Sequence, residues 1–264
     1  MQNLLVHTPR AYFALVPLVV CIAFTSPINA WADTCSPAIK DTSNTCGTYL
    51  TGCNVFAGGD QDIYPNPNGT TYWPQSSSVN ISSYNPYPVY VSSSAWDGLQ
   101  QLNSGKGLLA QVGWTHDTTS YNEYAFAQWT DNNGTFSLTH SFYTTPSGTN
   151  TFSVYRTSNG TFDLEWNGGY FLPPSNVNWG PDDVAIEGEV GGYYSGNGDH
   201  FAGNKTTPVT FSGVHWGDQF GNNHTANLSY YGGNHPAQFP QSPSYGYIYS
   251  WNGSSFETWD NRCS

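Results

Sequence analysis

Two segments of the chain carry carboxyl and amide groups inside stretches that otherwise have the composition of β-strands. Glu187 and Glu189 lie two residues apart in Val184 to Tyr194, and Gln111 lies in Leu108 to Trp114. Side chains alternate between the two faces of a strand, and the apolar set must pack in the core. Gln111, Glu187 and Glu189 are therefore expected on the other face. There a carboxylate can act as a general base, and an amide can donate to an oxyanion.

Other catalytic patterns are absent from the sequence. It has no Gly-x-Ser-x-Gly elbow, no His-Glu-x-x-His, no phosphate-binding loop and no Cys-x-x-Cys pair. Six histidines follow the first 32 residues without metal-ligand spacing: His116, His140, His200, His215, His224 and His235. We therefore expect no metal ion and no cofactor.

The elements that must position these residues are strands. Aromatic residues make up 16% and charged residues 9% of the 264 residues, which include 28 glycines. This composition is typical of an all-β exported protein rather than a helical one. Ala95 to Leu102 is the one segment that resembles a short helix. From residue 105 onward, β-branched and aromatic stretches alternate with turns such as Asp131-Asn132-Asn133-Gly134.

This pattern predicts an all-β fold of two packed antiparallel sheets, a jelly-roll-like β-sandwich. The predicted strands are Leu108 to Trp114, Glu123 to Thr130, Thr135 to Tyr143, Thr151 to Arg156, Thr161 to Trp166, Val184 to Tyr194, Pro208 to Val214, Thr225 to Tyr231, Tyr245 to Trp251 and Ser254 to Trp259.

The first 32 residues have the features of a secretory signal peptide. Arg10 precedes an apolar run from Ala11 to Phe24, and Ala30-Trp31-Ala32 supplies small residues at a cleavage site. We expect cleavage after Ala32 and a secreted, extracellular protein. The rest is divided into an N-terminal segment, 33–104, irregular with early strands and a candidate activation segment, and a β-sandwich domain, 105–264.

Four cysteines remain after the signal peptide: Cys35, Cys46, Cys53 and Cys263. In an exported protein four thiols indicate two disulfides, for which three connectivities exist. We favour one bridge within the N-terminal trio and one to Cys263, which would tie down the irregular segment.

The charge balance limits the partners. Of 6 Lys and Arg only Arg10 is lost with the signal peptide, so 5 basic residues face 18 acidic ones and the net charge becomes −13. Such a surface repels phosphate backbones and anionic lipids. We therefore expect a monomer without nucleic-acid or membrane partners.

The order of several motifs resembles that of the neprosin-like proteins, secreted β-sandwich glutamic peptidases related in architecture to the fungal eqolisins. The matching segments are Ala110-Gln111-Val112-Gly113-Trp114, Tyr124-Ala125-Phe126-Ala127-Gln128-Trp129-Thr130-Asp131, Phe152-Ser153-Val154-Tyr155 and Glu187-Gly188-Glu189-Val190. The resemblance covers roughly Leu108 to Gly217 and implies a polypeptide substrate.

The resemblance assigns roles residue by residue. Glu189 falls on a catalytic glutamate of the neprosins, and Gln111 falls where neprosins carry their other catalytic glutamate. Eqolisins use a Gln and Glu pair, so this departure matches their dyad and not the neprosin one. Trp129 matches a tryptophan beside the site and is expected to line a substrate groove in preference to Gln128. Glu187 is expected to take part in substrate binding and to influence Glu189. Because neither motif has a basic residue, an acidic pH optimum is expected.

Two other functions stay open at this stage. Glu187 and Glu189, about 6.6 Å apart along a strand, can flank a sugar bond as acid and base in a jelly-roll glycoside hydrolase. The abundant Trp and Tyr also suit a non-enzymatic carbohydrate-binding module. Asp131 and Asn132 would fit a calcium loop in such a module, although we favour a hairpin turn.

Overall fold

The computed structural model describes residues 55–63, 73–84, 92–102, 107–117, 123–142, 145–173, 175–191, 202–204, 206–228, 246–249 and 254–260. The chain divides into two compact units, Met1–Trp31 and Ala32–Ser264, and every described residue belongs to the second. The predicted signal peptide and the four cysteines of the predicted disulfides lie outside the described residues.

The described residues form strands, turns and irregular connections, without a helix. The strands are β1 Val55–Asp62, β2 Pro74–Ser82, β3 Ser92–Gln101, β4 Leu108–Asp117, β5 Tyr124–Thr130, β6 Phe136–Phe142, β7 Thr149–Arg156, β8 Phe162–Trp166, β9 Gly169–Phe171, β10 Asp183–Gly191, β11 Val209–Asp218, β12 Asn223–Thr225, β13 Gly246–Tyr249 and β14 Phe256–Asp260.

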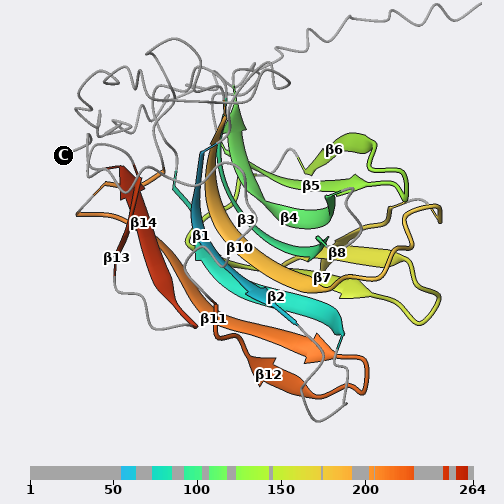
Figure 1. Ribbon diagram of the computed structural model, residues 1–264. Helices are drawn as coiled ribbons and strands as arrows, with labels where there is room; N and C mark the ends of the chain where they lie inside the picture. Colours follow the sequence, from blue (N-terminus) through green and yellow to red (C-terminus); the bar gives the residue numbers. More distant parts are fainter. Residues whose placement is uncertain are drawn as a thin grey trace, which may run out of the picture. The chain divides into compact units, whose positions relative to one another are not determined.

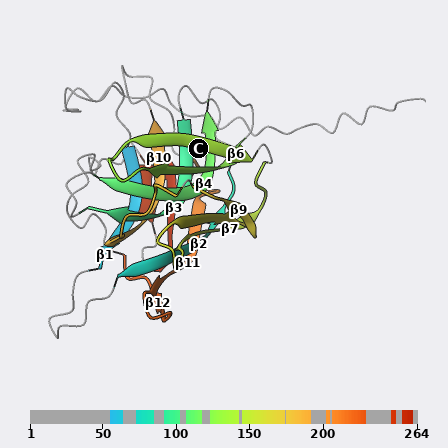
Figure 2. The same cartoon turned by 90° about the vertical axis from the view of Figure 1, so that its right-hand side faces the viewer.

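The strands form two antiparallel sheets that pack face to face (Figures 1 and 2). A six-stranded sheet has the order β1-β10-β3-β4-β5-β6. An eight-stranded sheet has the order β13-β14-β11-β2-β7-β8-β9, with β12 paired to β11. The predicted β-sandwich is confirmed, and strands far apart in the sequence, such as β3 and β10, become neighbours.

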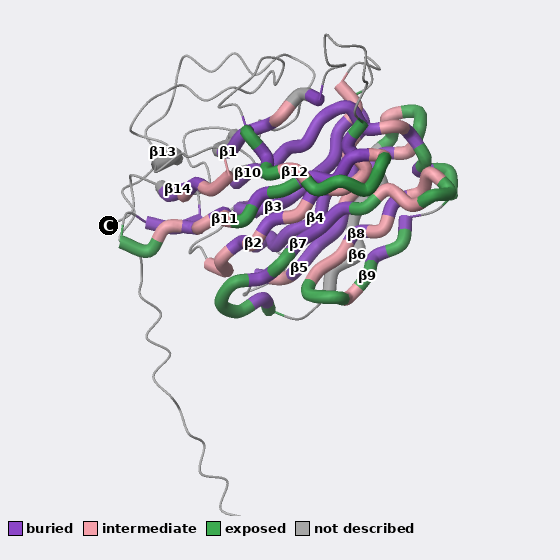
Figure 3. Tube along the Cα trace, turned by 90° about the horizontal axis from the view of Figure 1, so that it is seen from below, coloured by how far each residue is buried: buried purple, intermediate pink, exposed green. Residues whose placement is uncertain are grey.

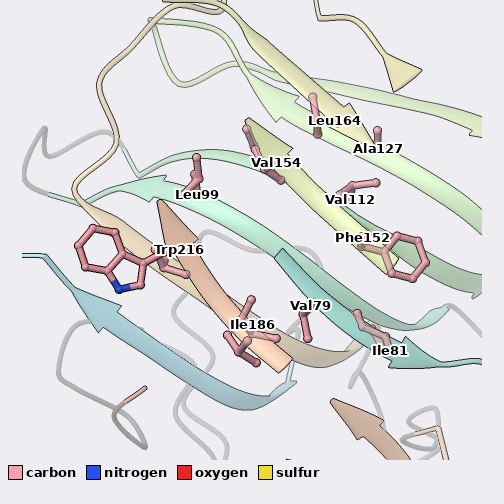
Figure 4. Close-up of a cluster of buried hydrophobic side chains, with 14 of the residues drawn as sticks. Val79, Ile81, Leu99, Val112, Ala127, Phe152, Val154, Leu164, Ile186 and Trp216 are labelled. Atoms are coloured by element: carbon pink, nitrogen blue, oxygen red, sulfur yellow. The ribbon is translucent and has the colours of Figure 1, made fainter. Parts of the chain in front are cut away.

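The core lies between the sheets and follows the period-2 alternation. Val112 of β4 and Ile186 of β10 point toward Val79 of β2 and Phe152 of β7, and these four side chains are at most 1% exposed. Figure 4 shows these side chains between the two sheets, and Figure 3 shows the buried strands at the centre and the exposed turns at the rim. Each such side chain contributes about 1.5–3 kcal/mol on burial, which fixes the face of every strand.

One polar contact crosses this core. The hydroxyl of Ser77 on β2 donates a hydrogen bond to Oδ1 of Asp97 on β3. Asp97 is fully buried, and its other oxygen has no hydrogen-bond partner among the described residues. Burial raises the pKa of the Asp97 carboxyl well above its usual range, against the hydrogen bonds from Ser77 and the Gly98 backbone. The neutral acid is therefore the form that suits the core.

Two sequence expectations need correction. The sandwich does not begin at residue 105, because β3 is central in the six-stranded sheet and β2 is central in the eight-stranded one. An activation segment would have to end before Val55 to leave both sheets intact. The segment Ala95 to Leu102 is not helical, since Ala95–Gln101 lies in β3 between β10 and β4. Its helical composition is overridden by the two neighbouring strands.

Candidate functional site

The outer face of the six-stranded sheet brings together the residues that the sequence singled out. Directly opposed residues of antiparallel strands point to the same face, and Glu187 pairs with Trp96 of β3, which pairs with Gly113 of β4. By alternation Glu189 and Gln111 share this face. All three polar residues therefore point away from the core, as the pattern predicted.

Four carboxyl groups line the β1–β10 side of this face. Asp60 of β1 and Asp183, Glu187 and Glu189 of β10 lie on it by register. Burial raises the pKa of Glu187 well above its usual range, and the charges of Glu189, Asp60 and Asp183 raise it further. Burial and these neighbouring charges thus favour the protonated form of Glu187, beside the half-buried Glu189.

A tryptophan that the sequence analysis did not select holds Glu189. Trp96 Nε1 donates a hydrogen bond to Glu189 Oε2 at 2.9 Å. Trp96 lies opposite Gly113, where an added Cβ would approach the Trp96 Cα and Cβ to 2.7 Å. The ring reaches along β3 as well, since its Cζ3 would lie 3.1 Å from a Cβ on Gly98. Glycine at position 113 therefore makes room for the donor that fixes one carboxylate oxygen.

Gln111 is held by a second amide. Its Nε2 donates to Oε1 of Gln128 on β5 at 2.7 Å, and the two residues are directly opposed. Gln111 Oε1 is buried and has no hydrogen-bond partner among the described residues. An acceptor in this state suits a donor such as a peptide N–H.

Gln111 and Glu189 lie on the same face, but they are not directly opposed across the strands. Gln111 pairs with Gly98, which pairs with Ala185, and Glu189 is four residues farther along β10. Two strand spacings of about 4.8 Å and four residues of about 3.3 Å separate their Cα atoms by about 16 Å. The Trp96 ring lies between the two positions. In this arrangement the two side chains do not hold one water molecule between them.

Trp129 lies on the other face of β5. It pairs with Ala110, belongs to the core cluster and is 3% exposed. Gln128, which alternates with Trp129 along β5, is the residue that would line a groove on the outer face. The prediction that Trp129 lines it is wrong. Phe126, Leu109 and Tyr124 provide apolar surface on the same outer face, where Phe126 packs with Trp96 and Ala185 in a small cluster.

Three residues of the site were not selected from the sequence, and a sequence signal existed for one of them. Asp183 falls in phase with Glu187 and Glu189, so the alternation of β10 includes it. Trp96 was hidden by the helical interpretation of its segment, and Asp60 by the irregular interpretation of the N-terminal segment, 33–104. No local pattern marks Asp60, because only the pairing of β1 with β10 gives it a place in the site.

The remaining candidate ligands have structural roles or stay apart. Asp131 Oδ1 accepts hydrogen bonds from the backbone N–H groups of Asn133 and Thr135 at 2.8 and 2.9 Å, so it shapes the β5–β6 turn. These donors, Thr135 first, lower the pKa of Asp131. Within the described ranges no group of three or more His, Cys, Asp or Glu side chains is placed to hold a metal ion. Nor do those ranges contain a helix with the length and apolarity to span a membrane.

No family model and no curated protein sequence matches the chain. Among solved structures, scytalido-glutamic peptidase with a peptide-based transition state analogue matches with a TM-score of 0.50 and 11% identity, covering 80% of this chain and 100% of that chain. SCP-B, a member of the eqolisin family of peptidases in complex with the tripeptide Ala-Ile-His, matches with a TM-score of 0.48 and 12% identity, at the same coverage. A Bacillus licheniformis β-glucanase matches with a TM-score of 0.34 and 13% identity, covering 55% of this chain and 64% of that chain. A TM-score this low does not indicate a shared fold. At these identities the likeness concerns the fold alone, which is eqolisin-like.

Proposed function

We propose that this protein is a secreted, acid-active endopeptidase in which Glu189 is the general base. The observation that carries the proposal is the pairing of two unequal carboxyl groups on one strand face. Glu189 is half-buried and accepts a hydrogen bond from Trp96, whereas Glu187, two residues away on β10, is fully buried and its pKa is raised, which favours its protonated form. The eqolisin-like fold supports the same substrate class.

The reaction needs a base that activates water and later returns the proton. The Glu189 carboxylate takes a proton from water, and the water oxygen forms a bond to the carbonyl carbon of the substrate. The proton then passes to the amide nitrogen as the C–N bond breaks, which leaves a carboxylic acid and an amine. Glu189 thus acts first as base and then as acid. Because burial favours the uncharged form of Glu187, that residue does not place a second negative charge beside Glu189.

Gln111 has a different task in this geometry. Because it lies about 16 Å from Glu189, we assign its amide to the binding of the extended peptide several residues from the scissile bond. Its buried, unpartnered Oε1 can accept a peptide N–H, while Gln128 fixes the orientation of the amide. The alternative from the resemblance, a Gln111 and Glu189 dyad on one water, requires the strands to shift.

The test compares Glu189→Gln with Gln111→Ala in hydrolysis of gelatin or casein at about pH 3 to 5. Glu189→Gln should reduce kcat by about 10²–10⁴-fold, as loss of a general base does. Gln111→Ala should mainly raise KM. Glu257→Gln removes a half-buried strand carboxyl from β14 and serves as the control, which should be unaffected. An equal fall in kcat for both site variants would instead establish the dyad, and full activity of Glu189→Gln would exclude Glu189 as the base.

A glycoside hydrolase is the second candidate, favoured by one observation. The pKa of Glu187 is raised by burial, and Glu189 lies two residues away on the same face, the arrangement of an acid and a base about 6.6 Å apart along the strand. Reducing sugar released from β-glucans without any proteolysis would identify this function. A module that only binds carbohydrate would show neither activity, whereas calcium-independent proteolysis lost in Glu189→Gln excludes it.

A further inference from the structure

The outer face of the eight-stranded sheet, on the opposite side of the sandwich from the candidate site, presents a second set of side chains with a common chemistry. Consecutive strand pairings align them in two adjacent rows. The upper row contains Thr225, His215, Ser78, Ser153, Glu165 and Tyr170, and the lower row contains Asn223, Gly217, Ser76, Tyr155 and Asp163.

Two exposed aromatic rings stand at opposite corners of one part of this face. Tyr155 on β7 is 39% exposed and Tyr170 on β9 is 57% exposed. Between them, on β8, lie the half-buried carboxyl groups of Asp163 and Glu165. A tyrosine ring is rigid and amphipathic, and its exposure on a strand leaves apolar surface uncovered.

The middle of the face is built from small residues. Ser76 and Ser78 of β2, Ser153 of β7 and Gly217 of β11 are neighbours in the two rows. The Ser78 and Ser153 hydroxyls are 2.9 Å apart, and a Cβ on Gly217 would approach the Ser76 hydroxyl to 2.5 Å. Ser153 and Gly217 are buried, so the tyrosines project beyond a low surface on which Ser76 and Ser78 are the partly exposed serines.

We propose that this face binds an uncharged polysaccharide. The apolar faces of sugar rings can stack on Tyr155 and Tyr170, while sugar hydroxyls donate to Asp163 and Glu165 and exchange hydrogen bonds with the partly exposed Ser76 and Ser78. A ligand that is apolar on its faces and rich in hydroxyls at its edges matches every group in the rows. The proposal is independent of the peptidase function, because no residue of the candidate site takes part.

The charge of the face selects against other polymers. The two rows contain Asp163 and Glu165 but no Lys or Arg, so phosphate or sulfate polymers would be repelled. A cationic polymer would be attracted by charge, but that attraction is screened by salt whereas stacking on aromatic rings is not. Salt dependence therefore distinguishes the two.

The test is affinity electrophoresis of the full-length protein in native gels that contain a soluble neutral polysaccharide, with barley β-glucan, xyloglucan, laminarin and dextran tried separately. At least one should retard the protein, and the retardation should persist at high salt. Tyr155→Ala and Tyr170→Ala should each weaken association about tenfold, as truncation of a central aromatic contact does. Tyr170→Phe, which keeps the ring, should retain most of the binding.

Phe220→Ala is the matched control, since Phe220 is an aromatic residue 65% exposed on the β11–β12 turn and outside the rows. It should bind like the unchanged protein, and all variants should keep its circular dichroism spectrum and its peptidase activity on a soluble peptide. Absence of retardation in every gel overturns the proposal. So does equal weakening in Phe220→Ala and Tyr170→Ala, and so does binding that high salt abolishes.

Discussion

At the scale of single residues, the candidate base is defined by its donor as much as by its own carboxyl group. Trp96 fixes one oxygen of Glu189 through a hydrogen bond from its indole N–H. A hydrogen bond to a charged group contributes about 1.5–3 kcal/mol, and it favours the ionised form, which is the form that accepts a proton. The position of the acidic limb of the pH–activity profile should therefore depend on this indole.

Trp96→Phe tests this dependence. Phenylalanine keeps an aromatic ring at position 96 but has no N–H, so kcat should fall by about tenfold or more. The acidic limb should also move to higher pH, because the carboxylate loses a stabilising donor. The measurement is kcat against pH for both proteins. Trp73→Phe, at an exposed tryptophan before β2, is the control. A fall in kcat with an unmoved profile would show that Trp96 has only a packing role.

At the scale of the strands, the site depends on glycines that pair with large side chains. Gly58 of β1 lies opposite Glu187, and a Cβ there would approach the Glu187 Cγ to 2.9 Å. Gly113 of β4 makes the same allowance for Trp96. Glu187 and Trp96 can approach the neighbouring strand this closely only because the residue paired with each of them is a glycine, which has no side chain. The spacing of β1, β10, β3 and β4 and the position of the acid pair are thus set together.

Gly113→Ala should disturb β4 and the site at once. The new Cβ meets the Trp96 Cα at 2.7 Å and the backbone carbonyl of Ala95 more closely still, so β3 and β4 must move apart. Such overpacking costs about 1–3 kcal/mol, which urea unfolding would measure. Gly180→Ala is the control, because a Cβ at that position meets nothing within 4 Å. Equal stability of the two variants would contradict the proposed close approach.

The strands and their faces were predictable because alternation is a local property. Gln111, Glu187 and Glu189 were placed on the correct face from period 2 alone. The register between strands is not a local property. The offset of Gln111 from Glu189 therefore emerged only from the pairing of β4 with β3 and of β3 with β10. Trp129 shows the same limit: its alternation with Gln128 was visible, but which of the two faces the core depended on the partner sheet.

At the scale of the whole sandwich, the two outer faces have separate chemistry and the core joins them. One outer face carries the acid pair and the other carries exposed tyrosines, so each can be changed without the other. The core between them contains the neutral carboxyl of Asp97, which accepts from Ser77 across the sheets. Burial also raises the pKa of Glu123 to about 7, against a backbone hydrogen bond. Together with Glu187, these groups make folding sensitive to pH.

The sandwich should therefore be more stable at about pH 4 than at about pH 7. A carboxyl with a higher pKa in the folded state binds its proton more tightly there, so its contribution is complete below the unfolded pKa and is lost as pH rises through the folded one. For Glu123 this window runs from 4.5 to about 7, and Asp97 loses its contribution from 3.8 upward. The melting temperature should fall by about 4 °C or more between about pH 4 and pH 7. Asp97→Asn mimics the protonated acid and should reduce this fall, whereas Asp163→Asn on the outer face should not. Thermal unfolding followed by circular dichroism measures all three proteins, and a melting temperature that rises toward neutral pH would contradict the buried neutral acids.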